Sequence, residues 1–129
     1  MSILNKILCV EDEPNIRAVI KLALKVGGFT TEICSSGAEA LAAAPLFLPE
    51  LILLDVMMPQ MDGPATLLAL HEISALQETP AIFMTAKVQA DEIAQYEKLG
   101  VLGVIAKPFD PMTLPDQIRN LWVKRSGIS

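Results

Sequence analysis

The sequence predicts a doubly wound α/β fold, in which five parallel strands are each followed by a helix. Apolar runs of strand length alternate with segments of helical period five times along the chain. The inner runs are apolar at every position, as in parallel strands that helices cover on both faces. The connections are short, and crossovers between parallel strands are right-handed. We therefore expect one domain over residues 1–129, with a core of about residues 4–124.

Composition excludes several classes of protein. With 52% hydrophobic and 19% charged residues, the chain has enough apolar surface to fold and is not intrinsically disordered. A net charge of −5 argues against a general nucleic-acid binder. The richest apolar stretch, 46–58, contains Glu50 and Asp55 and is too short to span a membrane. Because residues 1–10 lack the features of a signal peptide, we expect a cytoplasmic protein.

The first unit is a strand over residues 7–10 followed by a helix. Pro14 suits the first position of that helix, because proline lacks the N–H that would be unpaired there. Gly27 and Gly28 end it. Its apolar face consists of Ile16, Val19, Ile20, Ala23 and Leu24.

The second unit and the third strand follow directly. Residues 29–34 predict a strand and residues 38–44 a short alanine-rich helix that ends before Pro45. Residues 51–54 predict a strand buried on both faces.

The third helix starts near Gly63 and has apolar residues at helical spacing. These residues are Leu67, Leu70 and Ile73. A fourth strand over 81–84 precedes a helix over 89–99, which Gly100 ends. Residues 102–106 predict the fifth strand.

The start of the last helix is ambiguous. Asp110 can cap it with Pro111 at the first position, but Pro115 would then lack an N–H where the helix needs a donor. Alternatively, Thr113 is the cap and Asp116 closes a capping box. We expect an irregular first turn. The apolar stripe of this helix consists of Leu114, Ile118, Leu121 and Trp122, so Trp122 is expected in the core.

Polar residues occupy the ends of four predicted strands. They are Glu11, Asp12 and Glu13 after the first strand, Asp55 after the third, Thr85 after the fourth and Lys107 after the fifth. One such acid is readily explained by helix capping or by a solvated loop. Sheets of this class, however, bind ligands beyond the carboxyl ends of their strands. Four polar strand ends together therefore predict a functional site.

The acids of this site need a counter-charge. Two carboxylates roughly 4 Å apart repel by about 4 kcal/mol at an effective dielectric of about 20, so Glu11, Asp12 and Asp55 together call for a divalent cation, Lys107 or a proton. Oxygen ligands favour Mg²⁺, with Mn²⁺ as the alternative. The single histidine, His71, is expected on the surface of the third helix rather than in a zinc site.

A metal held by few carboxylates keeps coordination positions for water and a phosphoryl oxygen, so we expect chemistry on phosphate. Asp55 can act as the nucleophile and form an acyl phosphate. Lys107 can neutralise charge on the transferring group, and the Thr85 hydroxyl can donate a hydrogen bond to it.

The sequence resembles the response-regulator receiver domain of two-component signalling. The matching stretches are Val10-Glu11-Asp12-Glu13, residues 53–63 (LLDVMMPQMDG), Met84-Thr85-Ala86 and Lys107-Pro108-Phe109. All four occur in order, and the resemblance covers about residues 4–124. It implies a flavodoxin-like fold with strand order 2-1-3-4-5 and five helices.

The resemblance also implies roles for residues. Asp55 would be the phosphoacceptor in a magnesium-dependent reaction, making the chain a switch rather than a conventional enzyme. Asp12, Asp55 and the backbone carbonyl of Met57 would hold Mg²⁺, with Glu11 acting through a water.

Further implied roles concern the phosphoryl group and the partners. Lys107 would pair with phosphoryl oxygens, Thr85 would move to bind them, and the Lys107–Pro108 bond would be cis. The donor would be a histidine kinase or a histidine phosphotransfer protein. A downstream protein would bind the surface formed by helix 89–99, strand 102–106 and the last helix, without direct contact to nucleic acid or membrane.

One departure from the family concerns the switch. Val104 stands where the family usually has Tyr or Phe, so either Thr85 and its loop carry the signal alone or the output differs. We expect phosphorylation to shift the partner surface more weakly. Met57 and Lys87, two residues after Asp55 and Thr85, are either residues that tune hydrolysis or an ordinary loop residue and a solvated charge.

Three other functions fit the pattern less well. An aspartate-nucleophile phosphatase commonly has a second Asp two residues after the nucleophile, where this chain has Met57. A flavin or nucleotide carrier would have its phosphate repelled by the acids after the first strand. A pseudo-receiver that is not phosphorylated stays open because of Val104. The chain is either a stand-alone receiver or part of a larger regulator or hybrid kinase.

Overall fold

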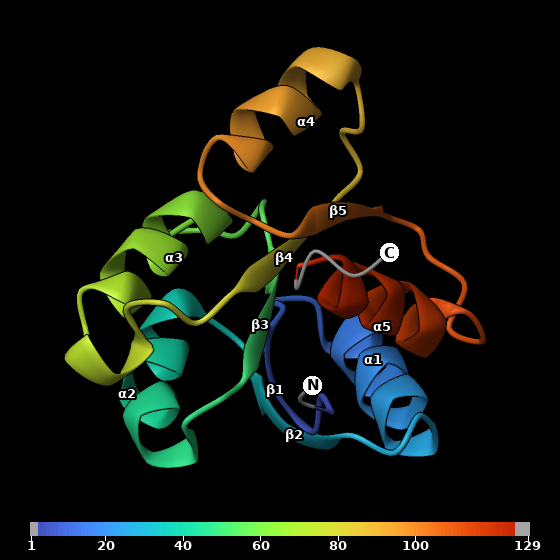
Figure 1. Cartoon of the computed structure of the whole chain (residues 1–129), viewed down its shortest axis with the longest axis horizontal. Helices are drawn as coiled ribbons and strands as arrows, with labels where there is room; N and C mark the ends of the chain where they lie inside the picture. Colours follow the sequence, from blue (N-terminus) through green and yellow to red (C-terminus); the bar gives the residue numbers. More distant parts are fainter. Residues whose placement is uncertain (1–2, 126–129) are drawn as a thin grey trace.

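The computed structural model describes residues 3–125 and contains a parallel sheet in the order β2-β1-β3-β4-β5 (Figure 1). The predicted class and strand order are confirmed. The strands are β1 (Lys6–Val10), β2 (Thr30–Cys34), β3 (Leu51–Asp55), β4 (Ala81–Thr85) and β5 (Gly103–Ala106).

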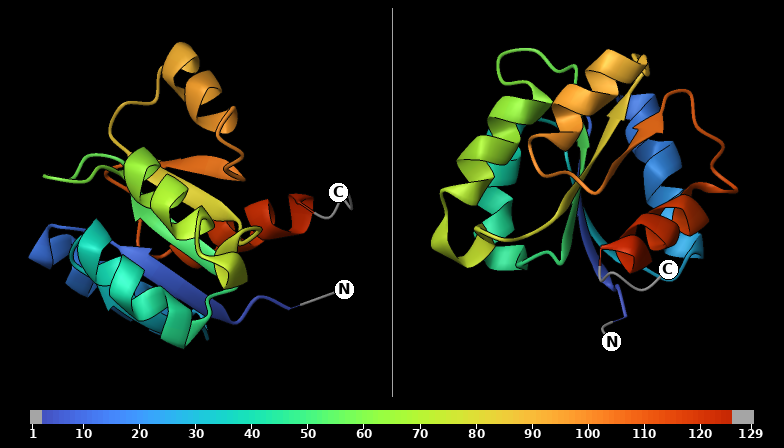
Figure 2. Two further views of the ribbon diagram at one scale, coloured as in Figure 1. Left: turned by 90° about the vertical axis from the view of Figure 1, so that its left-hand side faces the viewer. Right: turned by 45° about the horizontal axis from the view of Figure 1, so that its top comes forward.

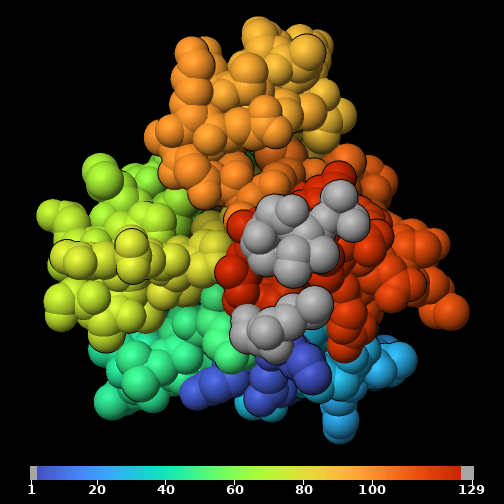
Figure 3. Space-filling view, in the orientation of Figure 1, coloured from blue at the N-terminus to red at the C-terminus, as the bar shows by residue number. Residues whose placement is uncertain are grey.

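Helices cover both faces of the sheet. They are α1 (Pro14–Val26), α2 (Gly37–Phe47), α3 (Gly63–His71), α4 (Ala90–Glu97) and α5 (Leu114–Lys124), with a 3-10 turn at Ser74–Leu76. Helices α1 and α5 lie on one face and α2 and α3 on the other, as Figures 1 and 2 show. Helix α4 lies beside β5 (Figure 1) and protrudes from the molecular surface (Figure 3). In the part of the chain from 3 to 125, every helix is too short or too polar to cross a bilayer.

Two apolar clusters flank the central strands. Alternate residues of a strand point to opposite faces, and in β3 every position from Leu51 to Asp55 is buried. Leu53 belongs to the cluster under α1 and α5, which includes Ile118 and Trp122. Leu54 belongs to the cluster under α2 and α3. The prediction of Trp122 as a core residue is confirmed, since it is 8% exposed.

Helix α2 differs from the prediction. It does not end before Pro45 but continues through it to Phe47. Pro45 lacks the N–H that would donate to the carbonyl of Leu41, but its ring is exposed to solvent and it removes only this one bond of the helix. Leu48 follows the helix as its cap: its backbone is left-handed, with a φ of 54°, and its amide donates to the carbonyl of Ala44.

Helix α3 is shorter than its apolar spacing predicts. It ends at His71, so Ile73 lies beyond it, although Ile73 still packs against the α2 and α3 cluster. His71, predicted to be a surface residue, is partly exposed and also makes a contact that the sequence did not predict. Its ring is half-buried, and Nε2 lies 2.9 Å from the carbonyl oxygen of Thr79.

The irregular start of α5 is confirmed, but the capping box is not. Thr113 is the residue before the helix and its side chain makes no cap hydrogen bond, so it forms no reciprocal pair with Asp116. The Thr113 hydroxyl instead donates to the carbonyl of Asp110 at 3.2 Å. Pro115 fits the first turn and is buried there.

Candidate functional site

The carboxyl ends of β1, β3 and β5 bring acids and a lysine together. Ligand oxygens of Glu11, Asp12 and Asp55 all lie within 4.8 Å of one another. Glu11 is 0% and Asp55 2% exposed, whereas Asp12 is half-buried. Parallel strands place their carboxyl ends at one edge of the sheet, which is why residues so far apart in sequence meet here.

Lys107 supplies the counter-charge within the cluster. Its Nζ lies 2.9 Å from Oε1 of Glu11 and 3.3 Å from Oδ1 of Asp55. The Lys107 amide donates to the carbonyl of Thr85, which ties the end of β5 to β4, and the Lys107–Pro108 bond is cis as expected. Three carboxylates beside one ammonium leave negative charge that a divalent cation would neutralise.

The protonation of this cluster reflects its burial. Burial raises the pKa of Asp55 from 3.8 to about 7, and the charge of Glu11 adds to the rise while Lys107 opposes it. For Lys107, burial lowers the pKa, but the hydrogen bond to Glu11 and the charge of Asp55 outweigh burial and raise it. A bound divalent cation would favour the carboxylate form of Asp55.

The loop after β1 is held by the end of β2, by the Glu11 side chain and by α1. The Glu11 amide donates to the carbonyl of Cys34 at 3.0 Å, and the Glu13 amide donates to Oε2 of Glu11 at 3.1 Å. Nη1 of Arg17 donates to the carbonyls of Glu11 and Asp12. The sequence analysis assigned Arg17 no role. The one sequence feature that could have indicated this contact is the position of a cation in the helix that follows the acids.

The segment after β3 packs tightly on the end of the strand. A Cβ at Gly63 would lie 2.6 Å from the carbonyl oxygen of Asp55, so only glycine allows α3 to start this close to the acid. Asp62 caps α3 by accepting from the amide of Ala65 at 2.9 Å. Met57, which lies in the loop between β3 and α3, is 60% exposed to solvent.

Thr85 faces the loop that leads to α4. Its side chain is buried, and its Oγ1 accepts from the amide of Lys87 at 3.0 Å. Nearby, Val104 is half-buried against the cluster that also includes Tyr96 of α4. The rings of Tyr96 and Phe83 meet edge to face, with centroids 5.4 Å apart. Sequence reasoning missed this aromatic pair.

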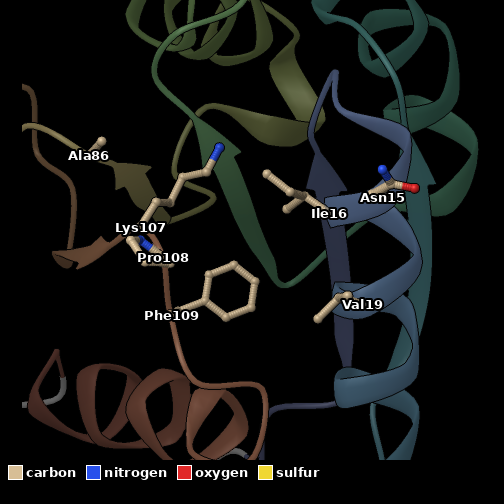
Figure 4. A pocket seen from close by; sticks show the side chains of 7 residues that line it. All are labelled: Asn15, Ile16, Val19, Ala86, Lys107, Pro108 and Phe109. Carbon is tan, nitrogen blue, oxygen red and sulfur yellow. The ribbon is translucent and has the colours of Figure 1, made fainter.

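An apolar cavity of about 400 Å³ opens next to the acidic cluster. Figure 4 shows Ile16 and Val19 of α1 on one side, with Lys107, Pro108 and Phe109 on the other. Lys107 therefore borders both the carboxylates and this cavity. A molecule that approaches Asp55 from this side would meet apolar surface first.

Comparison with known proteins identifies the family. A family model described as the response regulator receiver domain matches residues 7–119. The chain belongs to this family. The response regulator Rre1 of Synechocystis sp. is 33% identical over 124 residues, which is 95% of this chain and 54% of that protein. The DNA-binding response regulator MtrA of Mycolicibacterium smegmatis is 31% identical over 114 residues, covering 88% and 49% of the two chains.

A solved structure has the same receiver fold. The chemotaxis response regulator CheY4 of Vibrio cholerae superposes with a TM-score of 0.84 at 29% identity, covering 92% of this chain and 99% of that chain. This receiver spans about half of the length of Rre1 and MtrA. Receiver domains are phosphoacceptor switches that bind Mg²⁺ through acidic residues and interact with histidine kinases or phosphotransfer proteins.

Proposed function

We propose that this receiver is a phosphorylation-controlled switch in which Asp55 accepts a phosphoryl group from a phosphohistidine. The donor is a histidine kinase or a histidine phosphotransfer protein, and the reaction depends on Mg²⁺. The observation that carries the proposal is the burial of Asp55 at the end of β3, with two further carboxylates and the Lys107 ammonium around it. A divalent cation would reduce the repulsion that remains among these carboxylates.

The donor set suits a hard divalent cation. The ligand atoms available are carboxylate oxygens, and Mg²⁺ prefers oxygen, with Mn²⁺ as an alternative. Asp12, Asp55 and the carbonyl of Met57 would hold the ion, and Glu11 would act through a water. When bound, the metal supplies charge neutralisation for the transferring phosphoryl group.

The residues of the chain have separate tasks in the transfer. A carboxylate oxygen of Asp55 attacks phosphorus, the P–N bond to the donor histidine breaks, and the bonding electrons return to the imidazole nitrogen. Lys107, already 3.3 Å from Asp55, pairs with a phosphoryl oxygen. The product is an acyl phosphate on Asp55.

The switch in this proposal runs through Thr85. If its hydroxyl turns to donate to the phosphoryl oxygen, the Lys87 amide loses the acceptor it has at 3.0 Å. That change lies at the start of the loop leading to α4. Because Val104 has no ring to rotate, the shift of the α4, β5 and α5 surface is weaker than in receivers with an aromatic there. A downstream protein binds this surface.

Incubation with acetyl phosphate and Mg²⁺, followed by intact mass measurement, tests the acceptor. We expect one phosphoryl group on the native chain, none with Asp55→Asn and none when EDTA replaces the metal. Asp62→Asn is the matched control, because Asp62 is an exposed acid in the same segment and should leave phosphorylation intact. An unmodified native chain would favour the pseudo-receiver, and phosphate release over many turnovers would favour the phosphatase.

The output surface needs a separate measurement. We expect amide chemical shifts to change over α4, β5 and α5 when the native chain is phosphorylated. Unchanged shifts there, in a sample whose mass shows the added phosphoryl group, would contradict the proposed output.

A further inference from the structure

We infer that Arg17 is a positioning residue for the metal-binding loop, acting on the backbone of Glu11 and Asp12. The inference rests on the proposed magnesium site. It concerns how the loop keeps its acids aimed at the ion, and it assigns Arg17 no contact with metal or phosphate.

One nitrogen of Arg17 holds two successive peptide groups. Nη1 donates to the carbonyl oxygen of Glu11 at 3.0 Å and to that of Asp12 at 2.9 Å. These carbonyls belong to the peptide groups on either side of Asp12, so both are fixed by the same side chain. Hydrogen bonds from a charged donor are stronger than neutral ones.

Other contacts in the loop determine which residues would move if the Arg17 hydrogen bonds were lost. Glu11 is also held by its amide on the carbonyl of Cys34 and by its carboxylate on Lys107. Asp12 is half-buried and lies past the end of β1. The peptide group after Asp12 keeps one further contact, because the Glu13 amide donates to Oε2 of Glu11 at 3.1 Å. Release of the two carbonyls would therefore loosen the peptide groups around Asp12, most of all the one before it, while Glu11 stays in place.

Arg17 is itself well anchored. It lies in the first turns of α1, its side chain is half-buried, and its amide donates to the carbonyl of Glu13 at 2.9 Å. Among residues 3–125, the ion pairs found for the acidic cluster are those of Lys107 with Glu11 and Asp55. Arg17 thus acts through the backbone rather than as a counter-ion.

Backbone bracing and simple charge predict opposite effects on metal affinity. A positive charge close to a cation site repels the cation, so its removal by itself tightens Mg²⁺ binding. Loss of the brace weakens binding, since groups that orient metal ligands typically contribute about tenfold or more to affinity. The sign of the change in affinity therefore separates the two roles.

The test is a titration of the full chain with Mg²⁺ in the absence of any phosphodonor. Binding is measured by amide chemical shifts and by calorimetry. We expect Arg17→Gln to raise the dissociation constant about tenfold and Arg17→Lys to give an intermediate value. Lys21→Gln is the matched control, because Lys21 is an exposed cation one turn further along α1 and should give unchanged or slightly tighter binding. An Arg17→Gln variant that binds Mg²⁺ as tightly as the native chain, or more tightly, would overturn the inference.

Two further measurements separate this inference from the proposed function. Asp12→Asn must weaken Mg²⁺ binding; if the native chain and Asp12→Asn bind equally weakly, the proposed metal site fails and the inference fails with it. If circular dichroism shows that Arg17→Gln does not fold, Arg17→Lys decides. Weaker binding than native supports the inference, and equal or tighter binding overturns it.

Discussion

The acidic edge of the sheet and helix α4 are held in very different ways. Glu11 and Asp55 are almost fully buried at the carboxyl ends of central strands, and α3 starts so close to Asp55 that Gly63 admits no Cβ. Helix α4, in contrast, has no buried residue, and its Tyr96 is only half-buried against Phe83. Figure 3 shows this helix standing out from the remainder of the molecule.

The difference separates chemistry from signalling. A phosphoacceptor must be held by rigid elements so that its surroundings keep their geometry. A reporting element must change position for the small free energy that one modified side chain can supply. A helix with few buried contacts has a low local stability and meets that requirement. The fold thus places the rigid and the adaptable regions at neighbouring strands, β3 and β4–β5.

The same substitution in α5 and in α4 should separate these regions most clearly. Ile118 of α5 is 0% exposed, so Ile118→Ala should lower the free energy of unfolding by about 3 kcal/mol. Ile93 of α4 is half-buried, and Ile93→Ala should cost less than about 1 kcal/mol. Urea unfolding of both variants measures this. Equal losses would mean that α4 is as firmly packed as α5.

The acidic edge should carry an electrostatic cost that depends on pH. In the metal-free protein the pKa of Asp55 is about 7, above the 3.8 of an unfolded aspartate. The folded state therefore binds more protons than the unfolded state between these values, so stability falls as pH rises through this window. Asp55→Asn removes that cost and should stabilise the metal-free chain by on the order of 2 kcal/mol at pH 8.

The same comparison at low pH provides the control. Near pH 4 the Asp55 carboxyl is protonated in the folded state, so the stabilising effect of Asp55→Asn should largely disappear. Saturating Mg²⁺ at pH 8 should also reduce the difference in stability between Asp55→Asn and the native chain, since the ion stabilises the native carboxylates. The midpoints of urea unfolding at both pH values measure this. If Asp55→Asn stabilised the chain equally at both, the ionised Asp55 carboxylate would not be the cause of the stability difference.

The strands and their polar ends were predictable because each rests on a local pattern. Apolar runs mark buried parallel strands, and the topology of such sheets brings Asp12, Asp55 and Lys107 to one edge. The end of α2 was not predictable from composition. Pro45 is a helix breaker in general, but here it removes a single donor, and the Leu48 amide still bonds the carbonyl of Ala44, so the helix continues to Phe47.

Contacts between side chains and backbone were the least predictable. Arg17 binds two carbonyl oxygens, and every residue has a carbonyl, so its partners leave no mark in the sequence. The departure at Val104 was visible from sequence. The contact between Tyr96 and Phe83 could not be predicted from the sequence, because it depends on how α4 packs against the sheet.

Tyr96 should be the main attachment of α4. Tyr96→Ala removes the edge-to-face contact with Phe83 and should lower the free energy of unfolding by about 1 kcal/mol. Hydrogen exchange should become faster in α4 while β3 amides stay protected. Tyr96→Phe keeps the ring and should preserve the exchange pattern. If Tyr96→Ala leaves α4 exchange unchanged, another contact attaches the helix.

The connection between the two regions is tested by Thr85→Val, which should have the smallest effect on stability. Valine keeps the packing of the buried side chain but cannot accept from the Lys87 amide. Lys87 is exposed, so water can replace the lost acceptor, and the cost should stay below about 1 kcal/mol. Phosphorylation of this variant should still occur at Asp55, yet amide shifts in α4 should respond much less than in the native chain. Thr85→Ser retains the hydroxyl and should restore the response; a full response in Thr85→Val would show that the signal reaches α4 by another route.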